Sequence, residues 1–226
     1  MKHRLTKLTA AGLAALALTG CAGGASEGTP EDAETTWTLV AGQPEGSTCW
    51  DAAEQFASAL SDATEGAVAV EVQPVPIDRP TSLEQTVAGI VDLYLDSSLI
   101  YGSYGSKEEL ERPFFSVTMP FLFPDAETAA EVLDGTGGEA LNGILAELGL
   151  RGLAYGELGF RYLTADRPVT APEDLEGLKI RTAGMLELYG SYIGCWGTTY
   201  YSSSFSDVMT PLAAGDYDGQ ESTLAE

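Results

Sequence analysis

Apolar and polar residues follow one another along this chain in two patterns, one typical of strands and one typical of helices. Short apolar runs predict strands at 37–42, 67–72, 91–95, 152–156 and 178–182. Apolar residues recurring every three or four positions predict helices at 50–66, 82–89, 126–133, 139–148, 185–193 and 205–214. Strands that alternate with helices indicate an α/β fold with a largely parallel sheet.

Three further segments have weaker patterns. Thr170-Ala-Pro-Glu173 has the spacing of a capping box and predicts a short helix that ends at Gly177. Residues 117–123 are apolar and predicted to be extended around a proline, and 198–204 are polar and aromatic and are assigned no element. No internal repeat is visible.

The N-terminal segment is predicted to be a signal peptide. Basic residues (Lys2, Arg4 and Lys7) precede an uncharged stretch over 8–20, which is too short for a good membrane-spanning helix. Secretory signals have this order of a basic start and a short apolar run. We therefore expect residues 1–20 to direct export.

The signal ends in Leu18-Thr-Gly-Cys21, which resembles the bacterial lipobox at all four positions. The resemblance implies cleavage before Cys21 and a lipid on its thiol, so that the protein is extracytoplasmic and held at the membrane. The alternative is an ordinary signal peptide with an incidental cysteine. Residues 21–36 are rich in small and acidic residues and are predicted to be a flexible tether.

The net charge of the chain without residues 1–20 restricts the classes of function that it can have. Eight basic residues stand against 34 acidic ones, a formal charge of −26, which disfavours binding to nucleic acid. The sole histidine, His3, is also removed, which excludes His-based catalysis and metal sites from the remaining residues. No motif for a cofactor is present.

Two cysteines remain besides the lipidation site, namely Cys49 and Cys195. A disulfide is chemically allowed outside the cytoplasm. The sequence leaves open whether these two residues pair, because it does not give the distance between them.

Basic residues are concentrated in one region. Four of the eight lie between 161 and 181, namely Arg161, Arg167, Lys179 and Arg181. Arg181 is predicted to end a strand, and Arg161 to follow a turn after another strand. Ligands of open α/β sheets bind beyond the carboxyl ends of strands, where a guanidinium matches a carboxylate. The alternative is that these arginines form surface ion pairs with the many acidic residues.

Several segments together resemble the solute-binding proteins of TRAP (tripartite ATP-independent periplasmic) transporters, of the DctP type. The resemblance rests on Gly159-Phe-Arg-Tyr-Leu-Thr, Arg167-Pro, Pro172-Glu-Asp-Leu-Glu-Gly-Leu-Lys-Ile-Arg181 and Asp218-Gly-Gln-Glu221. Met119-Pro-Phe-Leu-Phe123 and Phe205-Ser-Asp-Val fit the same pattern. It spans roughly residues 37–226.

The resemblance implies a periplasmic-binding-protein-like (type II) fold of two α/β lobes, predicted here at 37–157 and 158–226. The lobes close over a small organic acid, which the protein delivers to a membrane permease. The ligand arginines fall on Arg181, which grips the carboxylate, and on Arg161. The aromatic residue near the ligand falls on Phe205, and a polar residue of the first lobe falls near Asp96 or Ser97.

The sequence departs from the family pattern at two places. Ser222 stands where asparagine is common, and a hydroxyl offers one donor where an amide offers two. The chain also stops at Glu226, whereas members of the family continue and return to the first lobe, so the expected fold is incomplete at its C-terminus. A fragment, a truncated gene and an incomplete sequence are all open explanations.

Two other functions compete with that of a TRAP receptor, which would not be an enzyme. One is a solute-binding lipoprotein of another importer class. The other is a hydrolase of cell-wall sugar that uses a carboxylate pair, although 34 acidic residues make accidental pairs common.

Overall fold

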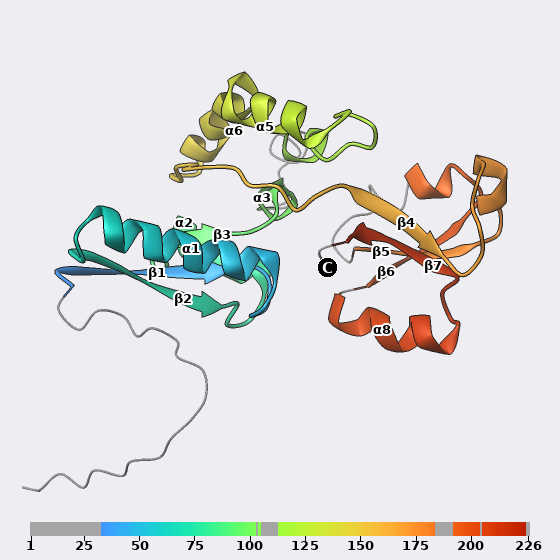
Figure 1. Ribbon diagram of the computed structural model, residues 1–226, viewed down its shortest axis with the longest axis horizontal. Coiled ribbons are helices and arrows are strands. Elements are labelled where there is room, and N and C mark those ends of the chain that lie inside the picture. The colour runs from blue at the N-terminus through green and yellow to red at the C-terminus, as the bar shows by residue number, and fades with distance from the viewer. Residues whose placement is uncertain (1–32, 103, 105–112, 184–191, 204, 225–226) are drawn as a thin grey trace, which may run out of the picture.

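The protein folds as two separate α/β lobes with a helical hairpin beside them (Figure 1). The computed structural model describes residues 33–102, 104, 113–183, 192–203 and 205–224. The predicted α/β class and the largely parallel pairing are confirmed.

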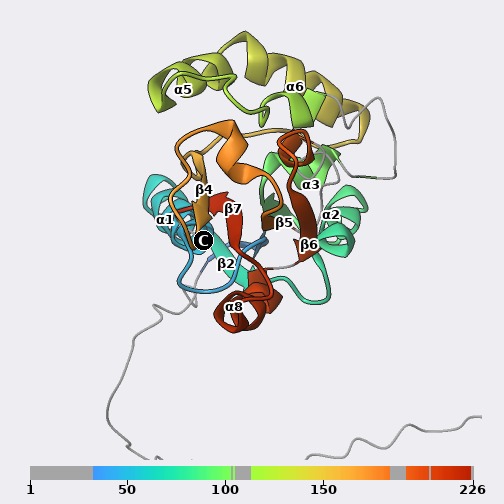
Figure 2. The ribbon, with the colours of Figure 1, turned by 90° about the vertical axis from the view of Figure 1, so that its right-hand side faces the viewer.

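The first lobe is a three-stranded parallel sheet in the order β2-β1-β3. Its elements are β1 (Thr35–Ala41), α1 (Thr48–Ala63), β2 (Val68–Pro74), α2 (Arg79–Val87) and β3 (Leu93–Leu95). Since β2 and β3 lie on opposite sides of β1, right-handed crossovers put α1 and α2 on opposite faces of the sheet. Figure 2 shows this arrangement.

The core of this lobe lies between β1 and α1. Trp50 and Ala53 of the helix pack against Leu39 and Ala41 of the strand. The helix begins where Ser47 accepts a hydrogen bond from the backbone N–H of Trp50, at 3.2 Å. The helical stripe predicted from Trp50 is thus confirmed at its N-terminal end.

The second lobe is a four-stranded sheet in the order β4-β7-β5-β6. Its elements are β4 (Arg161–Ala165), a 3-10 turn (Pro172–Leu175), β5 (Lys179–Ala183), β6 (Thr199–Ser203), α8 (Phe205–Ala214) and β7 (Gly219–Thr223). β5 runs parallel to β6 and β7, and β4 runs antiparallel to β7. Its core is formed by Leu175, Leu178, Ile180 and Ile193.

A helical hairpin joins the lobes. It consists of α5 (Ala126–Asp134) and α6 (Thr136–Glu147), which lie beside α3 (Ser98–Gly102) in Figure 1. Buried Phe114, Leu141 and Leu145 hold it together. Irregular residues 151–160 lead on to β4, and the predicted lobe boundary after residue 157 falls within this connection. None of the described helices is both long and apolar enough to cross a membrane.

Several sequence predictions need correction. Residues 152–156 form no strand, and Leu153 is 63% exposed, so this apolar run is not buried in a sheet. Residues 117–123 form turns rather than an extended segment. β1 begins at Thr35, two residues inside the predicted tether, because it pairs with β2 from there on. The helix predicted at 185–193 falls largely outside the described residues.

Candidate functional site

Each of the two sheets has a strand that lies between two later strands of the chain. β1 lies between β2 and β3, and β5 lies between β6 and β7. Such reversals of strand order open a crevice beyond the carboxyl ends of the strands. In Figure 1, β1 and β2 point toward the second lobe, and the C-terminal end of β7 lies on the side facing the first lobe. Candidate site residues of both lobes therefore lie at facing edges.

The first lobe holds a buried ion pair at its edge. The carboxylate of Asp96, directly after β3, accepts from Arg79 Nε at 2.7 Å and from Arg79 Nη2. It also accepts from the Tyr94 hydroxyl and from the Ser97 backbone N–H, the latter at 2.6 Å. Each carboxylate oxygen thus has two donors, and the side chain of Asp96 is 0% exposed. As placed, Asp96 positions Arg79 rather than presenting an open surface to a ligand.

A glycine makes room for this ion pair. A Cβ on Gly42, the residue after β1, would lie 2.2 Å from the carboxyl carbon of Asp96. The backbone N–H of Gly42 donates to the Leu95 carbonyl at 2.8 Å, which keeps the ends of β1 and β3 together. Burial and the neighbouring Asp96 raise the pKa of Tyr94, so its hydroxyl stays a donor.

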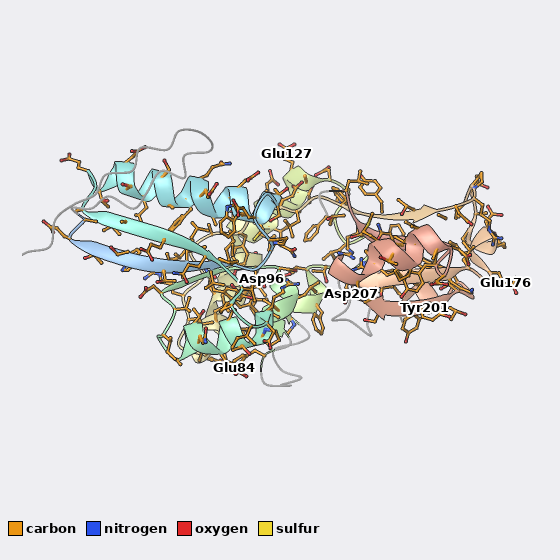
Figure 3. All side chains as sticks on the ribbon, turned by 90° about the horizontal axis from the view of Figure 1, so that it is seen from below. Glu84, Asp96, Glu127, Glu176, Tyr201 and Asp207 are labelled. Carbon is orange, nitrogen blue, oxygen red and sulfur yellow. The ribbon has the colours of Figure 1, made fainter. Side chains whose placement is uncertain are left out.

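A cavity of about 450 Å³ opens at this edge. It is lined by Gly42, Gln43, Pro44, Pro74, Val75, Asp78, Arg79 and Pro80. Its charged residues stand at the start of α2, where exposed Asp78 caps the helix by accepting from the Thr81 N–H at 2.7 Å. Figure 3 shows Asp96 at the end of the first lobe that faces the second lobe.

Arg181 occupies the corresponding place in the second lobe. It lies within β5, is only 1% exposed, and donates from Nε and Nη2 to the Ser203 carbonyl at 3.2 and 2.8 Å. Strand register puts Gln220 beside it, and Ser222, 5% exposed, on the same face of β7. The hydroxyl of Ser203 and the amide oxygen of Gln220 are buried without a hydrogen-bond partner in the described part of the chain.

Arg161 lies at the same edge but on the other face of the sheet. It is the first residue of β4, and the strand that was predicted to precede it at 152–156 does not form. Its Nε and Nη2 donate to the two carboxylate oxygens of Glu221, the second contact at 2.8 Å. Within the described residues, the hydroxyls of Thr182 and Thr223 are buried on this face without hydrogen-bond partners. The structure therefore brings both predicted arginines to one edge, each with a protein partner.

Other residues of the quoted motifs stabilise the fold. Arg167 donates to the Asp174 carbonyl at 3.1 Å, and the Asp174 carboxylate accepts from the backbone and hydroxyl of Thr170. The short helix thus forms, with Asp174 rather than Glu173 as its capping acid. Asp218 accepts from the Lys179 N–H at 2.7 Å and joins β5 to β7.

Some predicted residues are only partly described or do not come together. Phe205 begins α8, but its side chain lies outside the described residues, as does Cys21. Cys49 is buried in α1 and Cys195 is exposed in the second lobe, and the described residues contain no disulfide between them. No group of three or more potential ligands in the described chain suits a metal ion.

Sequence reasoning missed Arg79 and Gln220. Arg79 donates to the buried carboxylate of Asp96, but it stands between an aspartate and a proline in the sequence, where no periodicity marks it. Gln220 lies inside the quoted Asp218-Gly-Gln-Glu221 segment, which was the available signal.

The model of a known family, described as bacterial extracellular solute-binding protein, family 7, matches residues 40–226. The chain belongs to this family. The C4-dicarboxylate-binding periplasmic protein DctP of Rhodobacter capsulatus is 30% identical over 171 residues, 75% of this chain and 50% of that protein. The 2,3-diketo-L-gulonate-binding periplasmic protein YiaO of Escherichia coli is 30% identical over 173 residues, 75% of this chain and 51% of that protein.

Solved structures of family members share the fold. A TRAP periplasmic solute-binding protein from Ochrobactrum anthropi matches with a TM-score of 0.73 and 32% identity, covering 84% of this chain and 58% of that one. One from Chromohalobacter salexigens with bound D-glucuronate has a TM-score of 0.72 and 29% identity, covering 82% and 60%. The chain thus spans about half the length of the relatives named and has the TRAP-receptor fold.

Proposed function

We propose that the protein is an extracytoplasmic solute-binding lipoprotein that captures a small organic acid and delivers it to a TRAP-type membrane permease. The observation that carries this proposal is the buried Arg181 at the reversal of strand order in the second lobe, beside polar atoms of Ser203 and Gln220 that have no hydrogen-bond partner among the described residues. Buried polar atoms are normally hydrogen-bonded, so this group of atoms suits a polar ligand. The proposed role has no catalytic step.

The chemistry of the arginines favours a carboxylate. A guanidinium offers a planar fork that binds both oxygens of a carboxylate through charge-assisted hydrogen bonds. In our proposal Arg181 grips the ligand carboxylate. Losing such a contact costs ~2–5 kcal/mol, which corresponds to a ~30- to several-thousand-fold weaker affinity.

The other candidate residues take secondary roles in this proposal. Arg161 is a second contact for the carboxylate, in exchange with Glu221, and Ser222 donates a single hydrogen bond from the face that carries Arg181. Phe205 packs against the ligand from the start of α8. Ser97 and Asp96 support the first lobe, where the Ser97 N–H holds the Asp96 carboxylate in place.

The test compares two arginine-to-lysine variants of the full chain. Arg181→Lys keeps the charge but loses the fork, so calorimetry with a panel of organic acids should show at least a ~30-fold loss of affinity. Arg167→Lys is the matched control, since exposed Arg167 contacts only a backbone carbonyl, and it should bind as the wild type does. Equal binding by both variants would contradict the assigned role of Arg181.

The membrane location rests on the N-terminal sequence. We propose that residues 1–20 are removed and that a lipid on Cys21 holds the two lobes at the membrane through the following tether. The lipobox-like Leu18-Thr-Gly-Cys21 supports this. Cells given a radiolabelled fatty acid should label the wild type but not Cys21→Ser, and the variant should leave the membrane fraction. Label on the variant would exclude this cysteine as the attachment site.

A further inference from the structure

The outer strand of the second lobe lacks the features that usually protect the edge of a sheet. β6 pairs with β5 on one side and with no described strand on the other. Its first four residues are exposed, and the side chains of Tyr200 and Tyr201 are each 40% exposed. Edge strands are usually very short or carry a charge or a proline, because a bare edge pairs with other strands. β6 reads Thr-Tyr-Tyr-Ser-Ser and has neither a charge nor a proline.

The other edge strands of the same molecule do have such features. β2 carries an exposed Glu71 and ends at Pro74. β3 has only three residues, and β4 begins with Arg161. Among the edge strands that the structure describes, β6 is therefore the one of ordinary length that carries neither a charge nor a proline.

The distribution of charge along the chain points to the kind of partner. Residues 188–206, which include β6, contain no charged side chain, and this is the longest such run after residue 21. The whole chain has 34 acidic residues and a formal net charge of −23, so two copies repel each other over most of their surfaces. The uncharged edge at β6 is the place where this repulsion is weakest. A second copy can therefore approach there, and no basic partner is needed.

The backbone of β6 offers hydrogen-bonding groups on its outer side. The N–H of Thr199 donates to the Leu178 carbonyl at 2.8 Å, so the backbone groups of Thr199 point toward β5. Successive residues of a strand direct their N–H and C=O groups alternately to the two sides of the strand. The N–H and C=O of Tyr200 therefore point away from the sheet.

The sequence of β6 matches itself when two copies pair in antiparallel orientation. With Tyr200 of one copy opposite Tyr200 of the other, their outward N–H and C=O groups exchange hydrogen bonds. The same register puts Thr199 of each copy opposite Tyr201 of the other. Pairs of two aromatic residues, or of an aromatic and a β-branched residue, are favourable across strands. The ring of Tyr201 already packs on Tyr217, with ring centroids 5.3 Å apart, so little freedom is lost when it meets Thr199.

We propose that the protein forms a two-fold symmetric dimer through β6, in which the second-lobe sheets of two copies join into one continuous sheet. The pairing uses the β6 edge of both copies, so assembly stops at the dimer. Because the two β6 strands run antiparallel, the crevices of the two copies open in opposite directions. This proposal goes beyond the receptor function and does not depend on which ligand the protein binds.

Sedimentation velocity of the full chain tests whether the dimer forms. The interface is small, so we expect a dissociation constant on the order of 100 µM, measured over protein concentrations of about 10 to 1,000 µM. Raising the salt concentration should strengthen association, because salt screens the repulsion between two acidic copies. A monomer at every concentration and at high salt would overturn the proposal.

The decisive variant is Tyr200→Lys, with Gln73→Lys as its matched control. Both changes add one positive charge at an exposed position of an edge strand, but Gln73 lies in β2. Tyr200→Lys puts like charges opposite each other and should weaken the dimer at least ~10-fold. Gln73→Lys should leave association at or above the wild-type level, since it only lowers the net negative charge. Tyr200→Phe, which keeps the ring, should associate as the wild type does, and circular dichroism checks that each variant folds.

Cross-linking tests the same pairing without relying on a weakened variant. Directly opposite residues of a hydrogen-bonded antiparallel pair have Cα atoms about 5.5 Å apart, which suits a disulfide. In a background with Cys21→Ser and Cys195→Ser, mild oxidation of Tyr200→Cys should give a covalent dimer, and Gln73→Cys should give much less. Equal cross-linking of the two variants, or a dimer that Tyr200→Lys does not weaken, would show that β6 is not the interface.

Discussion

The two lobes are built alike but carry different charged side chains at the edges that face each other. Each has a strand, β1 or β5, that lies between the next two strands of the chain, and each has an arginine that donates through Nε and Nη2 to a carboxylate. In the first lobe Arg79 joins a helix to the end of β3, and in the second Arg161 joins two strands. The second lobe adds Arg181, and the first adds Asp78.

This difference shows how one strand arrangement serves two tasks. The strand order of each sheet places the side chains at its edge beside a crevice. The side chains then differ between the two edges, with Arg79, Asp96 and Asp78 in the first lobe and Arg161, Glu221 and Arg181 in the second. No repeat is visible in the sequence because the likeness lies in strand order, while the residues at the edges differ.

The largest expected difference between the lobes is the loss of stability when each ion-paired carboxylate is made neutral. Asp96→Asn should lower the free energy of unfolding by about 3 kcal/mol, because the four donors in this fully buried site would face a neutral amide in place of a carboxylate. Glu221→Gln should cost about 1–2 kcal/mol, because within the described residues its side-chain donor is Arg161, which is 22% exposed. Urea unfolding of both variants measures the difference. Equal costs would show that the two pairs are equivalent.

The next effect concerns two glycines at strand ends, Gly42 directly after β1 and Gly219 at the start of β7. A Cβ on Gly219 would lie 2.1 Å from the Thr164 carbonyl oxygen, which is backbone, whereas one on Gly42 meets the Asp96 side chain. Overpacking costs ~1–3 kcal/mol, and we expect Gly219→Ala at the upper end and Gly42→Ala at the lower end. Thermal unfolding checks the order.

Two further variants make the glycine comparison decisive. Gly143→Ala has open space around its Cβ in the middle of α6, so it should stabilise the protein by up to ~1 kcal/mol. Placing Gly42→Ala in an Asp96→Ala background should remove most of its cost, because the contacting carboxyl group is gone. Strict additivity of those two changes would show that the clash is not with Asp96.

The smallest expected effect is the response of the first lobe to alkali. Because burial and Asp96 raise the pKa of Tyr94 in the folded state, its contribution to stability is present below the ordinary tyrosine value of 10.0 and is lost as the pH rises above it. Tyr94→Phe should cost ~1 kcal/mol at neutral pH, and the gap to the wild type should narrow above pH 10. Tyr162→Phe, at an exposed position of the second lobe, is the control. A gap that stays constant would contradict the role given to Tyr94.

The sequence predicts the elements that bury a regular apolar stripe and misses those that do not. α5, α6 and α8 were expected at nearly their observed bounds. β7 was missed because Gly219–Thr223 has no apolar side chain, although it lies in the centre of a sheet with most of its residues buried. β6 was missed because it is an edge strand whose first four residues are exposed.

The sequence predicted a residue of the candidate site only where that residue stands out by itself in the sequence. Arg181 stands out in a chain with few basic residues, and the strand before it sets its place. The pair of Arg79 and Asp96 depends on two residues 17 positions apart that meet only when α2 packs beside β3. Their contact is a property of the tertiary structure, and neither residue has a local pattern that would reveal it.

The pairing of Arg161 with Glu221 makes anion binding in the second lobe an exchange reaction. The carboxylate of Glu221 already binds the guanidinium of Arg161. Because Glu221 belongs to the same chain, its effective concentration at the guanidinium is high and does not change on dilution. Chloride or phosphate must displace the Glu221 carboxylate in order to bind Arg161. A weakly bound ion such as chloride does not displace it. If the protein is the receptor proposed above, only an anion that gains further contacts elsewhere in the crevice takes its place, and the empty site is protected against common inorganic salts.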